Sequence, residues 1–91
     1  MSDRLARFLQ FVLPRRTWYR KFYLNTEHWK RTATEARIRA GHRCDRCGVR
    51  GGVKVLDVHH LTYKHLWREY PVDLQVLCRD CHKRLHKRRG R

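Results

Sequence analysis

The chain has 91 residues and carries 23 Lys and Arg against 8 Asp and Glu, which gives a formal net charge of +15 at pH 7. A chain of this length forms one domain at most, and such a small domain often needs a metal or disulfides for stability. No stretch approaches the roughly 20 apolar residues of a membrane span, and the apolar run 8–13 is too short for a secretory signal.

The excess of positive charge predicts a polyanionic partner, with nucleic acid favoured over an anionic membrane surface. A merely soluble basic surface is the less specific alternative. Since no targeting segment stands out, we expect a cytoplasmic protein of a bacterial or phage-infected cell, with no membrane association. Thiols stay reduced in that compartment, so paired cysteines there bind metal more often than each other.

Residues 1–24 are predicted to form a basic and aromatic extension. A short amphipathic helix is expected from apolar residues at helical spacing: Leu5, Phe8, Leu9 and Val12. We expect Pro14 to end this helix. The apolar face of this helix could mediate dimerisation, so the chain is expected to be a monomer or a homodimer. The following run 15–23 mixes cations with aromatic rings. That mixture suits contact with phosphates and stacking on bases, but the aromatics can equally well pack on the main domain.

Residues 25–40 are predicted to form a helix, which Asn25 or Thr26 can cap and Gly41 can end in the left-handed conformation. One face of this helix carries apolar residues that we interpret as core: Trp29, Ala33, Ala36 and Ala40. Farther along, the alternation in residues 53–58 predicts a strand after a glycine turn. A second short strand is expected over residues 74–77, and a helix from Cys78 onwards.

Two C-x-x-C pairs, Cys44 with Cys47 and Cys78 with Cys81, predict a structural zinc site with four thiolate ligands. The metal would join the start of the domain to the start of the last helix. Coordination by four thiolates leaves no open position, so this ion is expected to be structural and not catalytic. The alternatives are two disulfides or a redox-active pair.

Four of the seven histidines are spaced in a way that predicts chemistry. His59 and His60 are adjacent at the end of the first predicted strand, so their side chains point to opposite faces. His82 and His86 lie one turn apart on the last predicted helix. We therefore expect His59, His82 and His86 to bind a catalytic metal ion, and His60 to act as general base. Solvated side chains are the alternative.

Three segments together resemble the HNH endonuclease family: the first C-x-x-C pair, the run Leu56-Asp57-Val58-His59-His60-Leu61-Thr62-Tyr63, and the run Asp73-Leu74-Gln75-Val76-Leu77-Cys78 with Cys81 and His82. The resemblance spans residues 27–86. It implies an α+β class and a small zinc-stapled ββα-metal domain, here with an N-terminal helical extension. The nuclease domain would then occupy residues 25–88, followed by a basic tail over residues 89–91.

The resemblance also implies a role for individual residues. His60 resembles the general base, and His59 takes the place of the metal ligand before it. His82 resembles the ligand directly after the last zinc cysteine, and His86 resembles the additional histidine of the colicin-type DNases. Asp73 lies where many members have an asparagine that holds the loop and the base. An aspartate accepts hydrogen bonds there but cannot donate one through an amide.

We therefore expect a metal-dependent endonuclease that hydrolyses DNA phosphodiesters and, as the resemblance implies, leaves 5′-phosphate and 3′-hydroxyl ends. The catalytic ion would be Mg²⁺, Mn²⁺, Ni²⁺ or Zn²⁺, and a phage or mobile-element role is among those open. DNA contacts are predicted for cations in three segments: Arg15, Arg16, Arg20, Lys21, Lys64, Arg68, Lys83, Arg84, Lys87 and Arg88. The alternatives are a non-catalytic zinc module that binds nucleic acid, a zinc-ribbon adaptor, and an HNH enzyme that acts on RNA.

Overall fold

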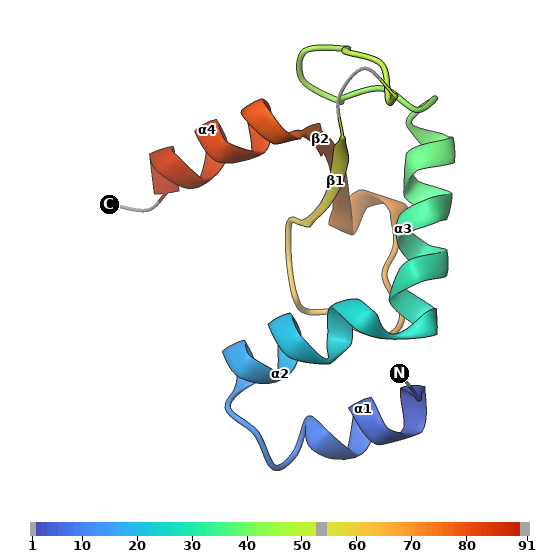
Figure 1. Cartoon of the computed structure of the whole chain (residues 1–91), viewed down its shortest axis with the longest axis vertical. Coiled ribbons are helices and arrows are strands. Elements are labelled where there is room, and N and C mark those ends of the chain that lie inside the picture. The colour runs from blue at the N-terminus through green and yellow to red at the C-terminus, as the bar shows by residue number, and fades with distance from the viewer. Residues whose placement is uncertain (1, 53–54, 90–91) are drawn as a thin grey trace. The chain divides into compact units, whose positions relative to one another are not determined.

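The computed structural model describes residues 2–52 and 55–89, with the backbone alone for residues 86–89 (Figure 1). The described elements follow in chain order: α1 (Asp3–Leu9), α2 (Arg15–Lys21), η1 (Tyr23–Asn25), α3 (Glu27–Arg39), β1 (Leu56–His60), η2 (Pro71–Asp73), β2 (Leu74–Cys78) and α4 (Arg79–Arg89). Helices combined with a two-stranded antiparallel sheet confirm the predicted α+β class. None of the described helices is long and apolar enough to span a membrane.

The chain divides into two compact units, Met1–Ala33 and Thr34–Arg91. The division falls inside α3, whereas the domain boundary expected from the sequence lies between residues 24 and 25. The predicted functional domain, residues 25–88, remains a prediction because compactness alone does not define where a function begins.

The helices of the first unit differ from the sequence prediction at Pro14. The first helix ends at Leu9, and Pro14 precedes α2 in the N-cap position, so the basic run that follows is helical. A proline fits the start of a helix as well as its end because its φ is already helical. The predicted apolar stripe is not the buried face either. Ala6 is buried, whereas Leu5 and Phe8 are exposed at 49% and 62%.

The core of the first unit is aromatic. Trp18 and Tyr23 are completely buried, and their ring centroids lie 5.2 Å apart. The Trp18 Nε1–H donates to the carbonyl oxygen of Ala6 at 2.6 Å, so burial leaves its polar atom satisfied. Asp3 accepts hydrogen bonds from the backbone N–H groups of Glu27 and His28 at 3.0 and 3.2 Å. Two roles were expected for the aromatic residues, contact with nucleic acid or packing. Trp18 and Tyr23 pack, and they do so in the core of their own unit.

Helix α3 is the helix that the sequence predicts over residues 25–40, but it begins at Glu27 and ends at Arg39. Thr26 is the N-cap residue, since its Oγ1 accepts from the backbone N–H of Trp29 at 3.1 Å, while Asn25 belongs to the preceding turn. Gly41 ends the helix with a φ of +68°. The predicted apolar face is buried at three positions and partly buried at the last: Trp29, Ala33, Ala36 and Ala40.

The sheet of the second unit pairs β1 with β2, with Leu56 opposite Cys78 and His60 opposite Leu74. The first strand begins at Leu56 and continues through His60, later than the alternation over residues 53–58 predicts. Residues 53 and 54 lie outside the described part, and Val55 is exposed at 59%. The second strand includes Cys78, so α4 begins one residue later than predicted.

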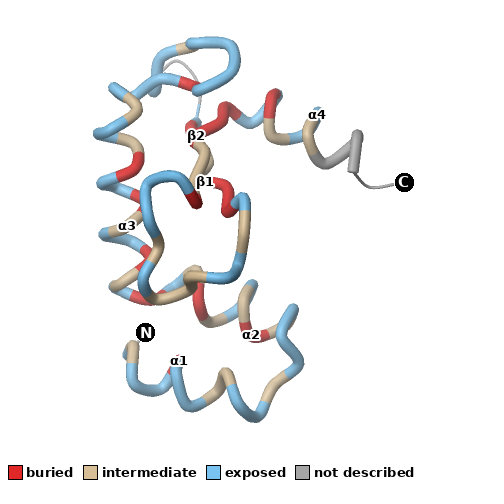
Figure 2. Tube along the Cα trace, turned by 180° about the vertical axis from the view of Figure 1, so that it is seen from behind, coloured by how far each residue is buried: buried red, intermediate tan, exposed pale blue. Residues whose placement is uncertain are grey.

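Buried residues of the second unit concentrate on the two strands and at the start of α4 (Figure 2). They form one core cluster: Ala36, Cys44, Leu56, Val76, Leu77, Cys78 and Cys81. Because successive side chains of a strand point to opposite faces, Asp57 and His59 lie on one face of the sheet and Leu56 and His60 on the other. The sheet thus presents the two adjacent histidines to different surroundings.

Candidate active site

The first cysteine pair lies in a tight turn closed by a bridge between Arg43 and Arg50. The backbone N–H of Gly48 donates to the carbonyl oxygen of Cys44 at 3.0 Å, and Gly48 takes a φ of +78°, which glycine adopts without strain. The backbone N–H groups of Arg46 and Cys47 both point at the sulfur of Cys44, at 3.4 Å. This is the local geometry of a zinc knuckle, in which amides surround the first ligand.

The four cysteine sulfurs gather as the sequence predicts. Their Sγ atoms all lie within 4.8 Å of one another, although 31 positions separate Cys47 from Cys78. All four cysteines are free, so the predicted alternative of two disulfides is not present. The Cys47 and Cys78 sulfurs are 3.7 Å apart. A tetrahedral zinc ion with bonds of about 2.3 Å needs sulfurs about 3.8 Å apart, so the cluster fits this ion.

Two of the thiols differ sharply in acidity. Burial disfavours the thiolate of Cys44, but backbone N–H groups of Cys47, Cys78 and Arg46 outweigh it and lower the pKa of Cys44 to about 6. Burial and, after it, hydrogen bonds with the other cysteines together raise the pKa of the Cys81 thiol to about 12. The amide-rich first knuckle therefore offers a thiolate near neutral pH, whereas Cys81 needs a cation to release its proton.

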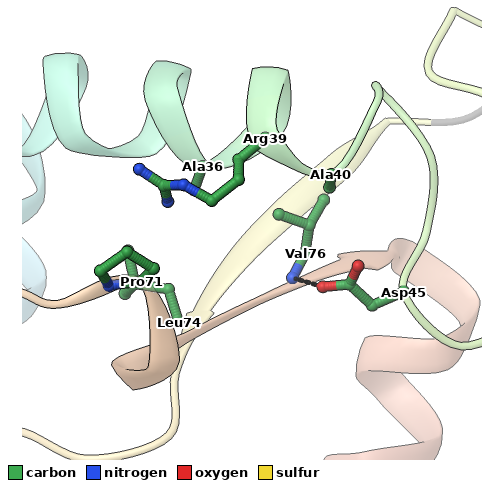
Figure 3. A pocket seen from close by; sticks show the side chains of 7 residues that line it. All are labelled: Ala36, Arg39, Ala40, Asp45, Pro71, Leu74 and Val76. Carbon is green, nitrogen blue, oxygen red and sulfur yellow. Dashed lines mark hydrogen bonds between the residues drawn. The ribbon is translucent and has the colours of Figure 1, made fainter.

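A residue inside the first knuckle also joins it to the sheet. The Asp45 carboxylate accepts from the backbone N–H of Val76 at 2.8 Å (Figure 3). The Asp45 N–H donates to the Val76 carbonyl oxygen at 2.7 Å. The same contact borders an open hollow between α3 and β2, which is lined by Ala36, Arg39, Ala40, Asp45, Pro71, Leu74 and Val76. Its lining includes neither histidine nor cysteine, so it is separate from the predicted metal and base residues.

On one face of the sheet, β1 and α4 bring His59 and His82 together. Their ring centroids lie 5.1 Å apart in an edge arrangement, and the Nε2 atom of His59 is buried. The Asp57 carboxylate contacts Nδ1 of His82 at 3.1 Å and the Arg79 guanidinium at 3.6 Å. A carboxylate bound at one imidazole nitrogen directs the other nitrogen toward a metal ion. Imidazole and carboxylate donors suit a divalent transition ion, so this pair fits the expected catalytic metal.

The predicted three-histidine metal site is only partly described. The side chain of His86 lies outside the described residues, although its backbone is in α4. Among the described side chains, the cysteine cluster is the one group of three or more ligand atoms close enough to share an ion. Asp57 was missed by the sequence reasoning. Its position two residues before His59, on the same strand face, was the available signal.

On the opposite face of the sheet, His60 lies in a closed environment. Its Nε2 is 2.8 Å from Oε2 of Glu69, and the two side chains are 0% and 1% exposed. The ring of Tyr63 lies 5.6 Å from the ring of His60. The sequence did not identify Glu69 as the partner of this His60 ring nitrogen. No periodicity pointed to Glu69, and only the scarcity of acidic residues marked it.

Asp73 forms hydrogen bonds within the segment between the strands. It is 5% exposed, and its Oδ2 lies 2.9 Å from both the backbone N of Tyr70 and Nδ1 of His65. Its backbone carbonyl accepts from the N–H of Leu61 at 2.8 Å. An acceptor meets these needs, so the lack of an amide donor at Asp73 leaves this segment anchored.

The cations predicted to contact DNA fall into three groups. The described ones are all exposed: Arg15, Arg16, Arg20 and Lys21 on α2, Lys64 and Arg68 between the strands, and Lys83 and Arg84 on α4. The side chains of Lys87 and Arg88 lie outside the described residues. Exposure on α4, beside the histidine pair, is what phosphate contact near a reacting bond requires.

Comparison with known proteins agrees with this geometry. Residues 44–88 match the family model described as HNH endonuclease. The matched segment contains the four cysteines, the histidine pair and the buried His60 and Glu69. No match was found among curated proteins or among solved structures. Through residues 44–88, the chain belongs to the HNH endonuclease family.

Proposed function

We propose that the chain is a metal-dependent endonuclease that hydrolyses DNA phosphodiesters and leaves 5′-phosphate and 3′-hydroxyl ends. The observation that carries this proposal is the pairing of His59 and His82 beside Asp57, in the segment that matches the family. A purely structural zinc module needs the cysteines but has no use for this second group of metal donors.

His59 and His82, together with His86, would hold the catalytic ion, and Asp57 would fix the orientation of His82. A divalent ion held by these residues would supply Lewis-acid chemistry that stabilises negative charge on the phosphate. Asp57 also forms an ion pair with Arg79, which would keep the carboxylate in place when DNA approaches. The residues of this face therefore bind and orient, and the proton chemistry falls to the other face.

His60 would take the proton from the attacking water. Its side chain has no exposed surface, and a general base must touch the water that it activates. We therefore infer that residues 61–68, which include Tyr63, move when DNA binds and admit water to His60, while Glu69 stays in contact with its ring. Faster amide exchange in this segment on DNA binding is expected, whereas unchanged exchange would contradict the inferred movement.

The cysteine cluster would bind a structural zinc ion that holds the start of α4, and with it His82, against the sheet. Exposed cations on α4 and in the segment 61–70 would contact phosphates, and the charge of +15 would steer the duplex. Such contacts contribute affinity without base readout, so cutting with little sequence preference is expected.

Nicking of a supercoiled plasmid tests the proposal. Wild-type protein is assayed with Mg²⁺, Mn²⁺, Ni²⁺ or Zn²⁺, beside His60→Asn and the matched control His42→Asn. His42 is exposed, and its φ of +57° is one that asparagine tolerates. We expect the control to cut like wild type and His60→Asn to lose activity while remaining folded by circular dichroism.

Equal cutting by wild type and His60→Asn would refute the assignment of the base. A folded wild type that binds DNA and cuts with none of the four ions would instead favour the alternative of a non-catalytic zinc module.

A further inference from the structure

The pair of His60 and Glu69 is the most completely buried titratable contact described in the second unit. The two side chains are 0% and 1% exposed, and 2.8 Å separates Nε2 from Oε2. His60 is the last residue of β1, and Glu69 lies nine positions later, just before η2. Burying a carboxylate is costly unless a specific partner offsets the loss of water. Because both side chains are buried, the ordinary pairing of charges at a protein surface does not explain this contact.

We propose that Glu69 is the positioning residue of the general base: it accepts the Nε2–H of His60 and thereby makes Nδ1 the atom that takes the proton. This inference rests on the proposed function. A neutral imidazole has one N–H and one acceptor nitrogen, so an ionised carboxylate at Nε2 leaves the lone pair on Nδ1. Water attack at phosphorus sends its proton to Nδ1. The bond to the 3′ oxygen then breaks, and that oxygen takes a proton from solvent.

Charge gives Glu69 a second effect on the same step. When Nδ1 gains the proton, His60 becomes a cation whose Nε2–H already points at a carboxylate. The contact between Nε2 and Oε2 is buried, and opposite charges interact more strongly in a buried contact than at a surface. Glu69 therefore stabilises the charge that develops on His60 during attack and also selects the tautomer.

A purely structural role for Glu69 fits the surrounding contacts less well. The segment between the strands is already anchored through Asp73, which contacts the backbone N of Tyr70 and Nδ1 of His65 and accepts from the N–H of Leu61. A further hydrogen bond from the Arg68 N–H to the His65 carbonyl oxygen closes a turn just before Glu69. Holding this segment in place does not require an additional buried charge.

The first test reads the tautomer of His60 directly in the zinc-loaded full chain without DNA. Long-range ¹H–¹⁵N correlation spectra distinguish Nε2–H from Nδ1–H, and the signals of His60 are those missing from His60→Asn. We expect Nε2–H in wild type and in Glu69→Gln, whose amide oxygen still accepts, and loss of this preference in Glu69→Ala. An Nδ1–H tautomer in wild type would overturn the proposal, whatever the variants do.

The second test reads the reaction. Glu69→Gln and Glu69→Ala are compared with Glu35→Gln, an exposed glutamate on α3. We expect the maximal nicking rate to fall about 10–100-fold in both Glu69 variants, with half-saturating DNA and thermal midpoint little changed. Added formate should partly restore Glu69→Ala and leave the control unaffected.

Each outcome of the second test has a separate meaning. Glu69→Gln that cuts like wild type would overturn the charge effect, and Glu69→Ala that cuts like wild type or that formate does not restore would overturn the positioning role. Absence of cutting by wild type would refute the proposed function itself, while the Nε2–H tautomer would still show the pairing.

Discussion

Replacing one buried cysteine should unfold the second unit, because the cluster closes a long stretch of chain. In Cys81→Ser a hydroxyl, a poor zinc ligand, takes the place of a sulfur that is 5% exposed. The cluster joins Cys47 to Cys78 across 31 positions. Cross-linking a chain of that length removes about 4 kcal/mol of unfolded-state entropy at 25 °C. A unit of this size is stable by only about 3–9 kcal/mol in total, so the loss is comparable to the whole.

The measurement is a urea titration of Cys81→Ser followed by circular dichroism, with metal content determined in parallel. Arg46→Ser is the matched control, since the Arg46 side chain is exposed and its contact with Cys44 runs through the backbone. We expect the control to keep its metal and its midpoint. If Cys81→Ser stays within about 1 kcal/mol of wild type, the cluster does not provide the stability that the loop-closure argument assigns to it.

Further substitutions test contacts in both units. Trp18→Phe removes the donor to Ala6 and should destabilise the first unit by about 1–3 kcal/mol, read by amide exchange over residues 2–33; an effect below about 0.5 kcal/mol would contradict the buried hydrogen bond. Gly41→Ala should cost about 1 kcal/mol in a thermal melt, from backbone strain alone, because no described atom lies within 4 Å of the added Cβ; a neutral effect would argue against the left-handed helix end. Asp73→Asn keeps an acceptor and should be tolerated, while Asp73→Leu should cost about 1–3 kcal/mol in a urea titration; equal losses would refute the acceptor role. Lys83→Ala should reduce the slope of log affinity against log salt by about 0.9 in a DNA titration, and an unchanged slope would exclude a phosphate contact.

Patterns of local origin were predictable from the sequence. The start of α3 at Thr26, its end at Gly41 and its apolar face all follow from capping chemistry and helical period, which act within a few residues. The cysteine cluster was predictable because metal ligation brings recognisable spacing with it. The opposite faces of His59 and His60 follow from the period of a strand.

Features that depend on long-range contacts or on ambiguous signals were not predictable. Pro14 can end one helix or begin the next. It begins α2, whose residue Trp18 is buried by tertiary packing. Glu69 contacts His60 through an irregular segment whose course no periodicity describes. Burial of His60 depends on the same segment, so the sequence predicted a base but not its enclosure.

The two hydrogen bonds between Asp45 and Val76 have a consequence for solubility. Each strand of a two-stranded sheet has an unpaired outer edge, to which a strand from another molecule can add. Asp45 occupies both main-chain groups of Val76 on the side turned away from β1. Removal of the metal ion from the cysteine cluster would release Asp45 from Val76. The outer edge of β2 could then pair with a strand of another molecule. A metal chelator should therefore cause the protein to aggregate, and this effect would be independent of any loss of nuclease activity.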